Sequence, residues 1–286
     1  MQPITFDYEP LTTRLAAWAK ADDNISAVVI VGSRARADHP ADEWADLDLV
    51  VLARDPQTLW AGTAWLEAIG EPWLTFIEPT PDGRTYERRV LFAGGLDVDF
   101  VPVSVASLME VLDRGLAQGL VLLERGARIL VDKDGLAQRA IDSVVPARPA
   151  PPPTEAEFLN LVHDFWYHTV WAAKHLRRGD LWVGKYCCDS YLKGHLLRMI
   201  EWHARAAKGW DTDTWMYGRF MDEWADPRAV AALKHAFAHY NEGDVWRALE
   251  ATILRNKIIA LAVGGCAGIG LIIGAVKVAS GGRKRE

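Results

Sequence analysis

The sequence predicts an α+β protein, in which an N-terminal mixed sheet with helices is followed by a C-terminal helical domain. Two observations separate the halves. Short β-branched and apolar runs, bounded by glycine, proline and aspartate, recur over residues 1–146, as is typical of strands joined by turns. From Thr154 onward, apolar residues recur instead at three- and four-residue spacing, as is typical of amphipathic helices.

Predicted helices and strands alternate along the N-terminal half. Apolar residues at helical spacing predict a helix over residues 11–21, and Pro56 in a first turn predicts another over 57–68. Gly94-Gly95 separates two strand-like runs and therefore predicts a hairpin. The predicted strands cover residues 25–31, 46–52, 73–77, 87–92, 96–103 and 128–132, and a further helix covers 104–112.

A proline-rich linker, residues 147–153, is expected to be extended because proline cannot continue a helix or a sheet. Thr154 follows it, and Glu157 stands three residues later, which is the capping-box pattern of a helix start. The helical domain is then expected over residues 154–257. Its predicted helices cover residues 158–178, 181–207, 226–240 and 244–257.

Charge and cysteine content restrict the function. The 286 residues carry a formal net charge of −6, which disfavours a nucleic-acid binder and suits a small cationic substrate. The cysteines Cys187, Cys188 and Cys266 form no disulfide framework and no zinc-ligand pattern. Because the N-terminus also lacks the pattern of a signal peptide, we expect a reducing, cytoplasmic location.

The C-terminal tail, residues 258–286, differs from the rest of the chain. Residues 258–276 are all apolar or glycine, and this run is long enough for a membrane-spanning helix. Glycine lowers helix propensity, however, and the rest of the chain has the composition of a soluble protein. A packed, disordered or non-native segment is therefore the alternative, and we expect no membrane contact.

Three aspartates carry the predicted chemistry. Asp46 and Asp48 share one face of a strand, because side chains alternate along a strand. Their neighbours are apolar, so these carboxylates are costly to bury unless a cation compensates them. Asp99 lies in a second apolar strand, although Asp97 shares its face and the residues alone leave both open. Carboxylates gathered in this way predict a Mg²⁺ site.

A turn of three residues, Gly32-Ser33-Arg34, follows the first predicted strand. Glycine lets the backbone approach a phosphate, and the serine hydroxyl and the backbone N–H groups donate hydrogen bonds. An ordinary turn is the alternative, and Arg34 could equally face solvent. The aspartates one strand later favour phosphate binding, and the combination predicts metal-assisted nucleotidyl transfer.

This pattern resembles that of the nucleotidyltransferase superfamily related to DNA polymerase β. Longer segments, spread over roughly residues 1–255, are similar to the aminoglycoside 6-adenylyltransferase (streptomycin adenylyltransferase) family. An isoleucine-Asp-leucine run of that family supports Asp99 over Asp97. The similar segments include Gly95-Leu96-Asp97-Val98-Asp99-Phe100-Val101-Pro102, Phe165-Trp166-Tyr167, Ala173-Lys174 and Leu196-Leu197-Arg198-Met199-Ile200-Glu201-Trp202.

The resemblance implies that AMP is transferred from ATP to a hydroxyl of streptomycin, at position 6, with release of pyrophosphate and resistance to the antibiotic as the consequence. Asp46 and Asp48 would hold the Mg²⁺ that binds the triphosphate. Asp99 would complete a second metal site or take the proton of the attacking hydroxyl. Gly32 and Ser33 would hold the β and γ phosphates.

The acceptor is assigned to the helical half. A cationic aminoglycoside needs carboxylates and stacking rings, and the candidate residues are Trp166, Tyr167 and Asp189, with Asp164 and Glu201 as further acids. Core packing is the alternative for Trp166. Lys185 is the candidate for a phosphate contact, with a solvated lysine as the alternative.

Two other functions stay open. The first is nucleotidyl transfer to another small hydroxyl acceptor. The second is a non-catalytic binding module with the same fold, which the presence of all three acids disfavours.

Overall fold

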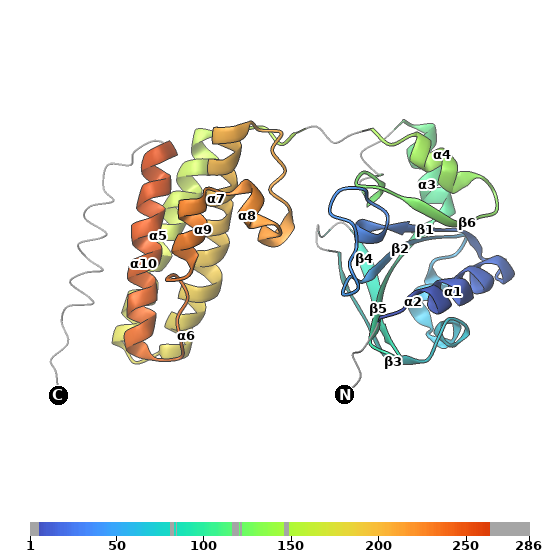
Figure 1. Cartoon of the computed structure of the whole chain (residues 1–286), viewed down its shortest axis with the longest axis horizontal. Coiled ribbons are helices and arrows are strands. Elements are labelled where there is room, and N and C mark those ends of the chain that lie inside the picture. The colour runs from blue at the N-terminus through green and yellow to red at the C-terminus, as the bar shows by residue number, and fades with distance from the viewer. Residues whose placement is uncertain are drawn as a thin grey trace. The chain divides into compact units, whose positions relative to one another are not determined.

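The computed structural model describes residues 6–80, 83, 85–115, 120, 122–145 and 149–263. The chain divides into two compact units, Met1–Arg148 and Pro149–Glu286 (Figure 1). The first unit contains a six-stranded mixed sheet with helices, and the second is largely helical. The predicted fold class is therefore confirmed.

The sheet has the strand order β3-β4-β5-β2-β1-β6. Only β2 and β5 run parallel, and the other neighbouring pairs are antiparallel. The strands are β1 (Ile25–Val31), β2 (Leu47–Ala53), β3 (Pro72–Pro79), β4 (Tyr86–Phe92), β5 (Leu96–Ser104) and β6 (Arg128–Asp132).

Helices cover both faces of the sheet (Figure 1). The first face packs against α1 (Glu9–Ala21) and the neighbouring turns, and the second against α3 (Val105–Asp113) and α4 (Leu136–Asp142). Alternate residues of β1 therefore enter different cores: Val28 and Ile30 the first, Val29 and Val31 the second. A strand buried on both faces is almost continuously apolar, which explains why β1 has the predicted bounds; its one polar side chain, Ser26, donates a hydrogen bond to Asp134.

One predicted helix of this unit is interrupted. Instead of a single helix over residues 57–68, α2 (Gln57–Ala61) ends at Gly62, and a 3₁₀ segment, η2 (Ala64–Ala68), follows. The indole Nε1–H of Trp65 donates to the carbonyl of Gly62 at 3.1 Å. The break coincides with Gly62, whose backbone is extended and does not continue the helix.

The helical unit opens with residues 149–154, which have no regular structure. Thr154 and Glu157 form the predicted capping box at the start of the first helix. The helices are α5 (Glu155–Arg177), α6 (Leu181–Tyr186), α7 (Leu192–Lys208), α8 (Met221–Trp224), α9 (Pro227–Leu233) and α10 (Glu242–Val263). A π-helical segment, Cys187–Tyr191, joins α6 to α7 inside the single helix predicted over 181–207.

The predicted helix over residues 226–240 is wrong in its second half, because α9 ends at Leu233. The guanidinium of Arg247 donates to the carbonyls of His235 and Phe237 at 2.7 and 2.9 Å. Those carbonyls are thereby held by a side chain instead of by N–H groups of a continuing helix.

The last described helix, α10, extends to Val263, so residues 258–263 of the predicted tail continue a helix. The remainder of the tail lies outside the described residues. In the described part of the chain, none of the helices combines the length and the apolar character needed to cross a membrane.

Candidate active site

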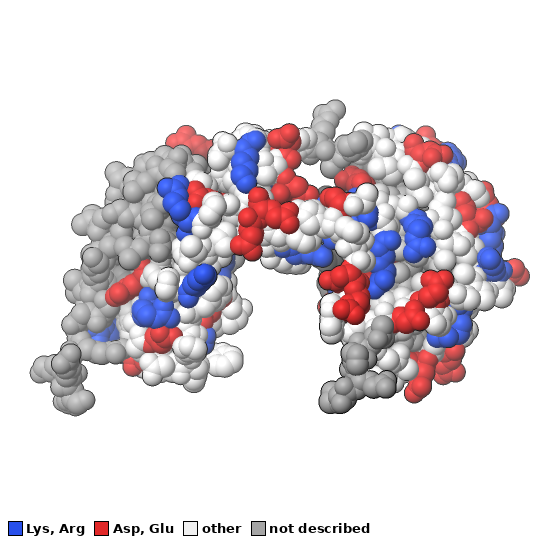
Figure 2. Space-filling model, viewed as in Figure 1, with Lys and Arg blue, Asp and Glu red and all other residues white. Residues whose placement is uncertain are grey.

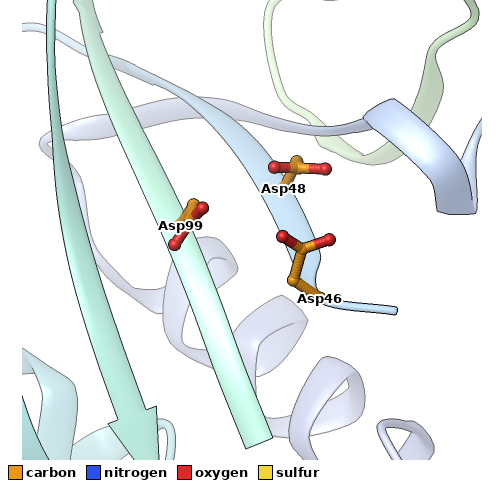
Figure 3. Close-up of side chains that lie close together, drawn as sticks. All are labelled: Asp46, Asp48 and Asp99. Carbon is orange, nitrogen blue, oxygen red and sulfur yellow. The ribbon is translucent and has the colours of Figure 1, made fainter. Parts of the chain in front are cut away.

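The three predicted aspartates meet on one face of the sheet. Asp48 on β2 lies directly beside Asp99 on β5, because the parallel register pairs these two residues. Asp46 precedes β2 and points to the same region (Figure 3). One ligand oxygen from each of the three carboxylates lies within 4.8 Å of the others. The structure therefore brings together the cluster predicted from the spacing.

This cluster lies at the end of an apolar row. Asp48 stands two residues before Val50, and Asp99 four residues before Val103, and both valines pack on the side of the sheet covered by α3 and α4. Asp99 is only 4% exposed, whereas Asp46 and Asp48 are half-buried. The three carboxylates therefore lie at the edge of a hydrophobic core, with Asp46 and Asp48 partly accessible to solvent.

The pKa of Asp99 is raised to about 8, chiefly by burial; Arg89 opposes this rise, and the charges of Glu87, Asp48 and Asp46 add to it. A site that disfavours one more negative charge in this way is a site that favours a cation. Three convergent carboxylate oxygens are hard ligands of the kind that Mg²⁺ prefers. The residues present therefore fit a divalent cation.

The turn before the aspartates approaches them closely. Gly32 opens a 3₁₀ segment, Gly32–Arg34, directly after β1, and its φ is +67°. A β-carbon at this position would lie 2.1 Å from Oδ2 of Asp48. Only glycine combines this backbone conformation with this close contact.

Ser33 and Arg34 have different surroundings. The Ser33 side chain is buried, and within the described residues its hydroxyl has no hydrogen-bond partner. Arg34 instead donates to the carbonyls of Ala45 and Asp46, and its guanidinium lies 3.9 Å from the ring centre of Tyr8. Arg34 therefore braces the segment that carries Asp46, and its contact with phosphate stays a prediction.

Asp97, the alternative to Asp99, lies outside the cluster. Its carboxylate Oδ1 accepts a hydrogen bond from the hydroxyl of Tyr8 at 3.0 Å. The structure thus gathers Asp99 with the other two aspartates, as the resemblance favoured.

Two residues of β4 that the sequence analysis did not single out border the cluster. Arg89 lies directly opposite Asp99 in the antiparallel register, and its Nη2 is 3.2 Å from Oδ2 of Asp99. Glu87 is 5% exposed and lies 3.1 Å from the same nitrogen. The run of charged residues at 87–89 was visible in the sequence, but the register of β4 with β5 was not.

The aromatic candidates of the helical unit differ in exposure. Trp166 is 2% exposed and belongs to the core of the helical unit. Most of its side chain therefore serves core packing, the alternative considered for this residue. Its indole Nε1 has no hydrogen-bond partner among the described residues. Tyr167 is 67% exposed. The two rings line a hollow of about 390 Å³ together with His163, Val170, Trp171 and Lys174.

Lys185 and Asp189 form an ion pair with each other. Both also hold the backbone of Ala238: the Lys185 ammonium donates to its carbonyl at 2.8 Å, and its N–H donates to Asp189 at 3.3 Å. These contacts fix the segment after α9. The contacts of Lys185 with phosphate and of Asp189 with an acceptor stay predictions.

Asp164 joins two helices. Its carboxylate accepts hydrogen bonds from the Tyr191 hydroxyl at 3.1 Å and lies 3.1 Å from Nε2 of His195 and 2.5 Å from Nδ1 of His168. Burial raises its pKa, but the hydrogen bonds from His195 and Tyr191 outweigh burial and lower it. This network links α5 to the segment of Tyr191 and His195, so these histidines have a structural role.

Comparisons with known proteins agree with the resemblance. A family model described as streptomycin adenylyltransferase matches residues 7–269. The aminoglycoside 6-adenylyltransferase of Bacillus subtilis (strain 168) is 22% identical over 240 residues, 81% of each chain. That of Staphylococcus aureus is 24% identical over 231 residues, 78% of each chain. A crystal structure of an aminoglycoside 6-adenyltransferase from Bacillus subtilis aligns over 95% of both chains, with 17% identity and a TM-score of 0.43.

The family match extends over both units and includes the three aspartates, whose arrangement is consistent with metal binding in a nucleotidyltransferase. This chain belongs to the streptomycin adenylyltransferase family.

Proposed function

We propose that this protein transfers AMP from ATP to a hydroxyl of an aminoglycoside, streptomycin at position 6, and releases pyrophosphate. The convergence of Asp46, Asp48 and Asp99 carries the proposal, because adenylyl transfer needs a divalent cation at the triphosphate. The curated relatives named aminoglycoside 6-adenylyltransferase support the choice of acceptor. The use of ATP and the free, buried thiols of Cys187 and Cys188 suit a cytoplasmic enzyme.

In this proposal Asp46 and Asp48 hold Mg²⁺ at the triphosphate, and Asp99 completes a second metal site or takes the proton of the attacking hydroxyl. Divalent cations held by these carboxylates would supply charge stabilisation for the entering and leaving oxygens of an in-line displacement. The burial of Asp99 suits a proton acceptor, since burial raises its pKa to about 8 and so makes it a stronger base than an ordinary carboxylate.

The phosphates are proposed to lie against the turn at Gly32 and Ser33. The buried Ser33 hydroxyl lacks a partner among the described residues, so an incoming phosphate oxygen would satisfy it. The positive φ of Gly32 brings the turn against Asp48. Phosphate and metal would thereby be held side by side.

The acceptor is proposed to contact the helical unit. Tyr167 offers an exposed ring on which a cationic group can stack, next to Trp166 in the same hollow. Asp189 remains the proposed carboxylate partner of the acceptor, although it would have to share its charge with Lys185. Lys185 and Arg34 remain proposed phosphate contacts, although Lys185 already pairs with Asp189 and Arg34 already donates to two backbone carbonyls.

The test is mass spectrometry of streptomycin incubated with the protein, ATP and Mg²⁺. We expect streptomycin to gain one adenylyl group, at the hydroxyl of position 6, and to lose its antibiotic activity. A parallel panel of other aminoglycosides and of GTP identifies a different acceptor or nucleotide. Adenylylation of another compound but not of streptomycin would contradict the substrate, and no transfer to any acceptor would contradict the reaction.

A further inference from the structure

We propose that Arg89 is a positioning residue for Asp99, and that Glu87 holds Arg89 in place for this purpose. The inference deepens the proposed function and rests on it. Its basis is a cross-strand contact: Arg89 on β4 is the register partner of Asp99 on β5, and Nη2 of Arg89 is 3.2 Å from Oδ2 of Asp99. Asp99 in turn is the register partner of Asp48. Arg89, Asp99 and Asp48 therefore form one row across three neighbouring strands.

The guanidinium of Arg89 is held from its other side by two glutamates. Its Nε and Nη2 both lie 3.1 Å from Oε1 of Glu87. Its Nε also lies 2.5 Å from Oε1 of Glu78 on β3. Nη2 is thus shared between Glu87 and Asp99, and Nε between the two glutamates. A planar guanidinium engaged at two nitrogens has a fixed orientation, and so has the carboxylate that it contacts.

The charge distribution shows why this contact serves the site. Asp99 lies among like charges, and in the described residues Arg89 is the cation that contacts it. Without the guanidinium, repulsion from Asp46 and Asp48 would favour turning the Asp99 carboxylate away from the cluster. The contact of Arg89 engages Oδ2 of Asp99, and because a carboxylate is planar, fixing Oδ2 also restricts the position of Oδ1.

Stability alone is a weak explanation for such an arrangement. A buried ion pair often contributes little net stability, because desolvation of the charges offsets their attraction. Glu87, with 7% of its side chain exposed, bears this cost for a contact with Arg89, whose side chain is 35% exposed. Orientation of a reacting carboxylate is a function that an apolar replacement could not supply.

The neighbouring Arg88 provides a matched control. It occupies the next position of β4, so its side chain points to the opposite face of the sheet. There it donates to the carbonyls of Leu59 and Trp60 at 3.1 and 2.6 Å and to the Thr75 hydroxyl at 3.2 Å. Arg88 is buried and structural, and none of these three contacts involves an aspartate of the cluster.

The experiment compares Arg89→Met, Arg89→Lys and Glu87→Gln with Arg88→Met in the full-length protein. Two properties are measured: Mn²⁺ affinity by calorimetry without substrates, and kcat and KM for adenylyl transfer, each corrected for the folded fraction. For Arg89→Met we expect kcat or Mn²⁺ affinity to fall by about 10–100-fold, as for other residues that orient metal ligands. The acceptor KM should stay within about twofold, because Arg89 contacts Asp99 and not the acceptor.

Arg89→Lys should recover part of the loss, because lysine keeps the positive charge but lacks the planar guanidinium that contacts Glu87 and Asp99 together. Glu87→Gln should lower the same two properties by a smaller factor. Arg88→Met should lower thermal stability while the folded protein keeps its Mn²⁺ affinity and kcat. Folded Arg89→Met or Arg89→Lys protein with wild-type Mn²⁺ affinity and kcat would overturn the inference, as would equal losses in Arg88→Met.

The failure of the proposed function is distinguishable from the failure of this inference. If the wild-type protein transfers no nucleotide but Arg89→Met still weakens Mn²⁺ binding, positioning of Asp99 holds and the reaction assignment falls. If the wild-type protein is active and Arg89→Met changes neither property, the reaction stands and the positioning role falls.

Discussion

Asp99 shows how burial and charge act on a single residue of this site. It is almost fully buried, three other carboxylates lie near it, and the guanidinium of Arg89 contacts it. Burial and the like charges raise its pKa to about 8 in the metal-free protein. The residue therefore changes its protonation state in the range in which enzymes work, and a bound cation has to compete with that proton.

This competition predicts a pH dependence of stability. An unfolded aspartate has a pKa near 3.9, so between about pH 4 and pH 8 the folded protein keeps a proton that the unfolded chain has lost. Asp99 therefore makes the metal-free protein less stable as pH rises through this range. Added Mg²⁺ or Mn²⁺ should raise the melting temperature more at about pH 8.5 than at about pH 6. Thermal denaturation at both pH values checks this, and an equal shift would contradict the position of Asp99 at the metal.

Gly32 provides a second prediction at this scale. In Gly32→Ala the new β-carbon would collide with Oδ2 of Asp48, and the positive φ would cost about 1–2 kcal/mol in addition. We expect adenylyl transfer to fall by at least about tenfold, because Asp48 must move. Gly135→Ala is the control: its φ is +70°, but a β-carbon there would meet no atom within 4 Å. It should lose stability but keep activity, and equal activity losses in both variants would count against the close contact.

The secondary-structure elements show where sequence reasoning succeeds. The strand over residues 25–31 and the hairpin around Gly94-Gly95 were predictable, because their signals are local: a continuous β-branched run and two glycines with positive φ. The helix over 226–240 was mispredicted because its second half is held by Arg247, which comes later in the chain. A contact between distant segments leaves no periodic pattern in the segment that it interrupts.

The same distinction applies to the candidate site. The convergence of the three aspartates was predictable, because a two-residue spacing puts Asp46 and Asp48 on one face and the family pattern adds Asp99. The roles of Arg89 and Glu87 were not predictable, because they depend on the register between β4 and β5. Register is a property of the paired strands and not of either strand alone.

The start of α5 allows a prediction for a single element. Thr154 caps this helix: the N–H of Glu157 donates to the Thr154 hydroxyl oxygen at 3.2 Å, and Glu157 accepts from the N–H of Thr154 at 2.8 Å. Thr154→Ala should therefore lower the free energy of unfolding of the helical unit by about 1 kcal/mol, measured by chemical denaturation. Thr13→Ala, which removes a hydroxyl bonded to a carbonyl inside α1, is the control and should have a smaller effect. Equal effects would argue against the cap.

At the scale of the whole molecule, the two units divide the proposed work. The sheet unit contains the three aspartates and the turn at Gly32, and the helical unit contains Tyr167 and the hollow beside it. On the face that Figure 2 shows, acidic and basic side chains of the described residues are interspersed over both units. The family match extends through both units, so the complete chain is the object to assay.

The central claim is that Asp46, Asp48 and Asp99 form a metal-dependent adenylyl-transfer centre. Its most direct test is pyrophosphate release from ATP with streptomycin and Mg²⁺, by the wild-type protein and by Asp48→Asn. We predict release by the wild type and a rate at least about a hundredfold lower in folded Asp48→Asn, because loss of a metal ligand removes several kcal/mol of transition-state stabilisation. Folded Asp48→Asn that releases pyrophosphate at the wild-type rate would contradict the account.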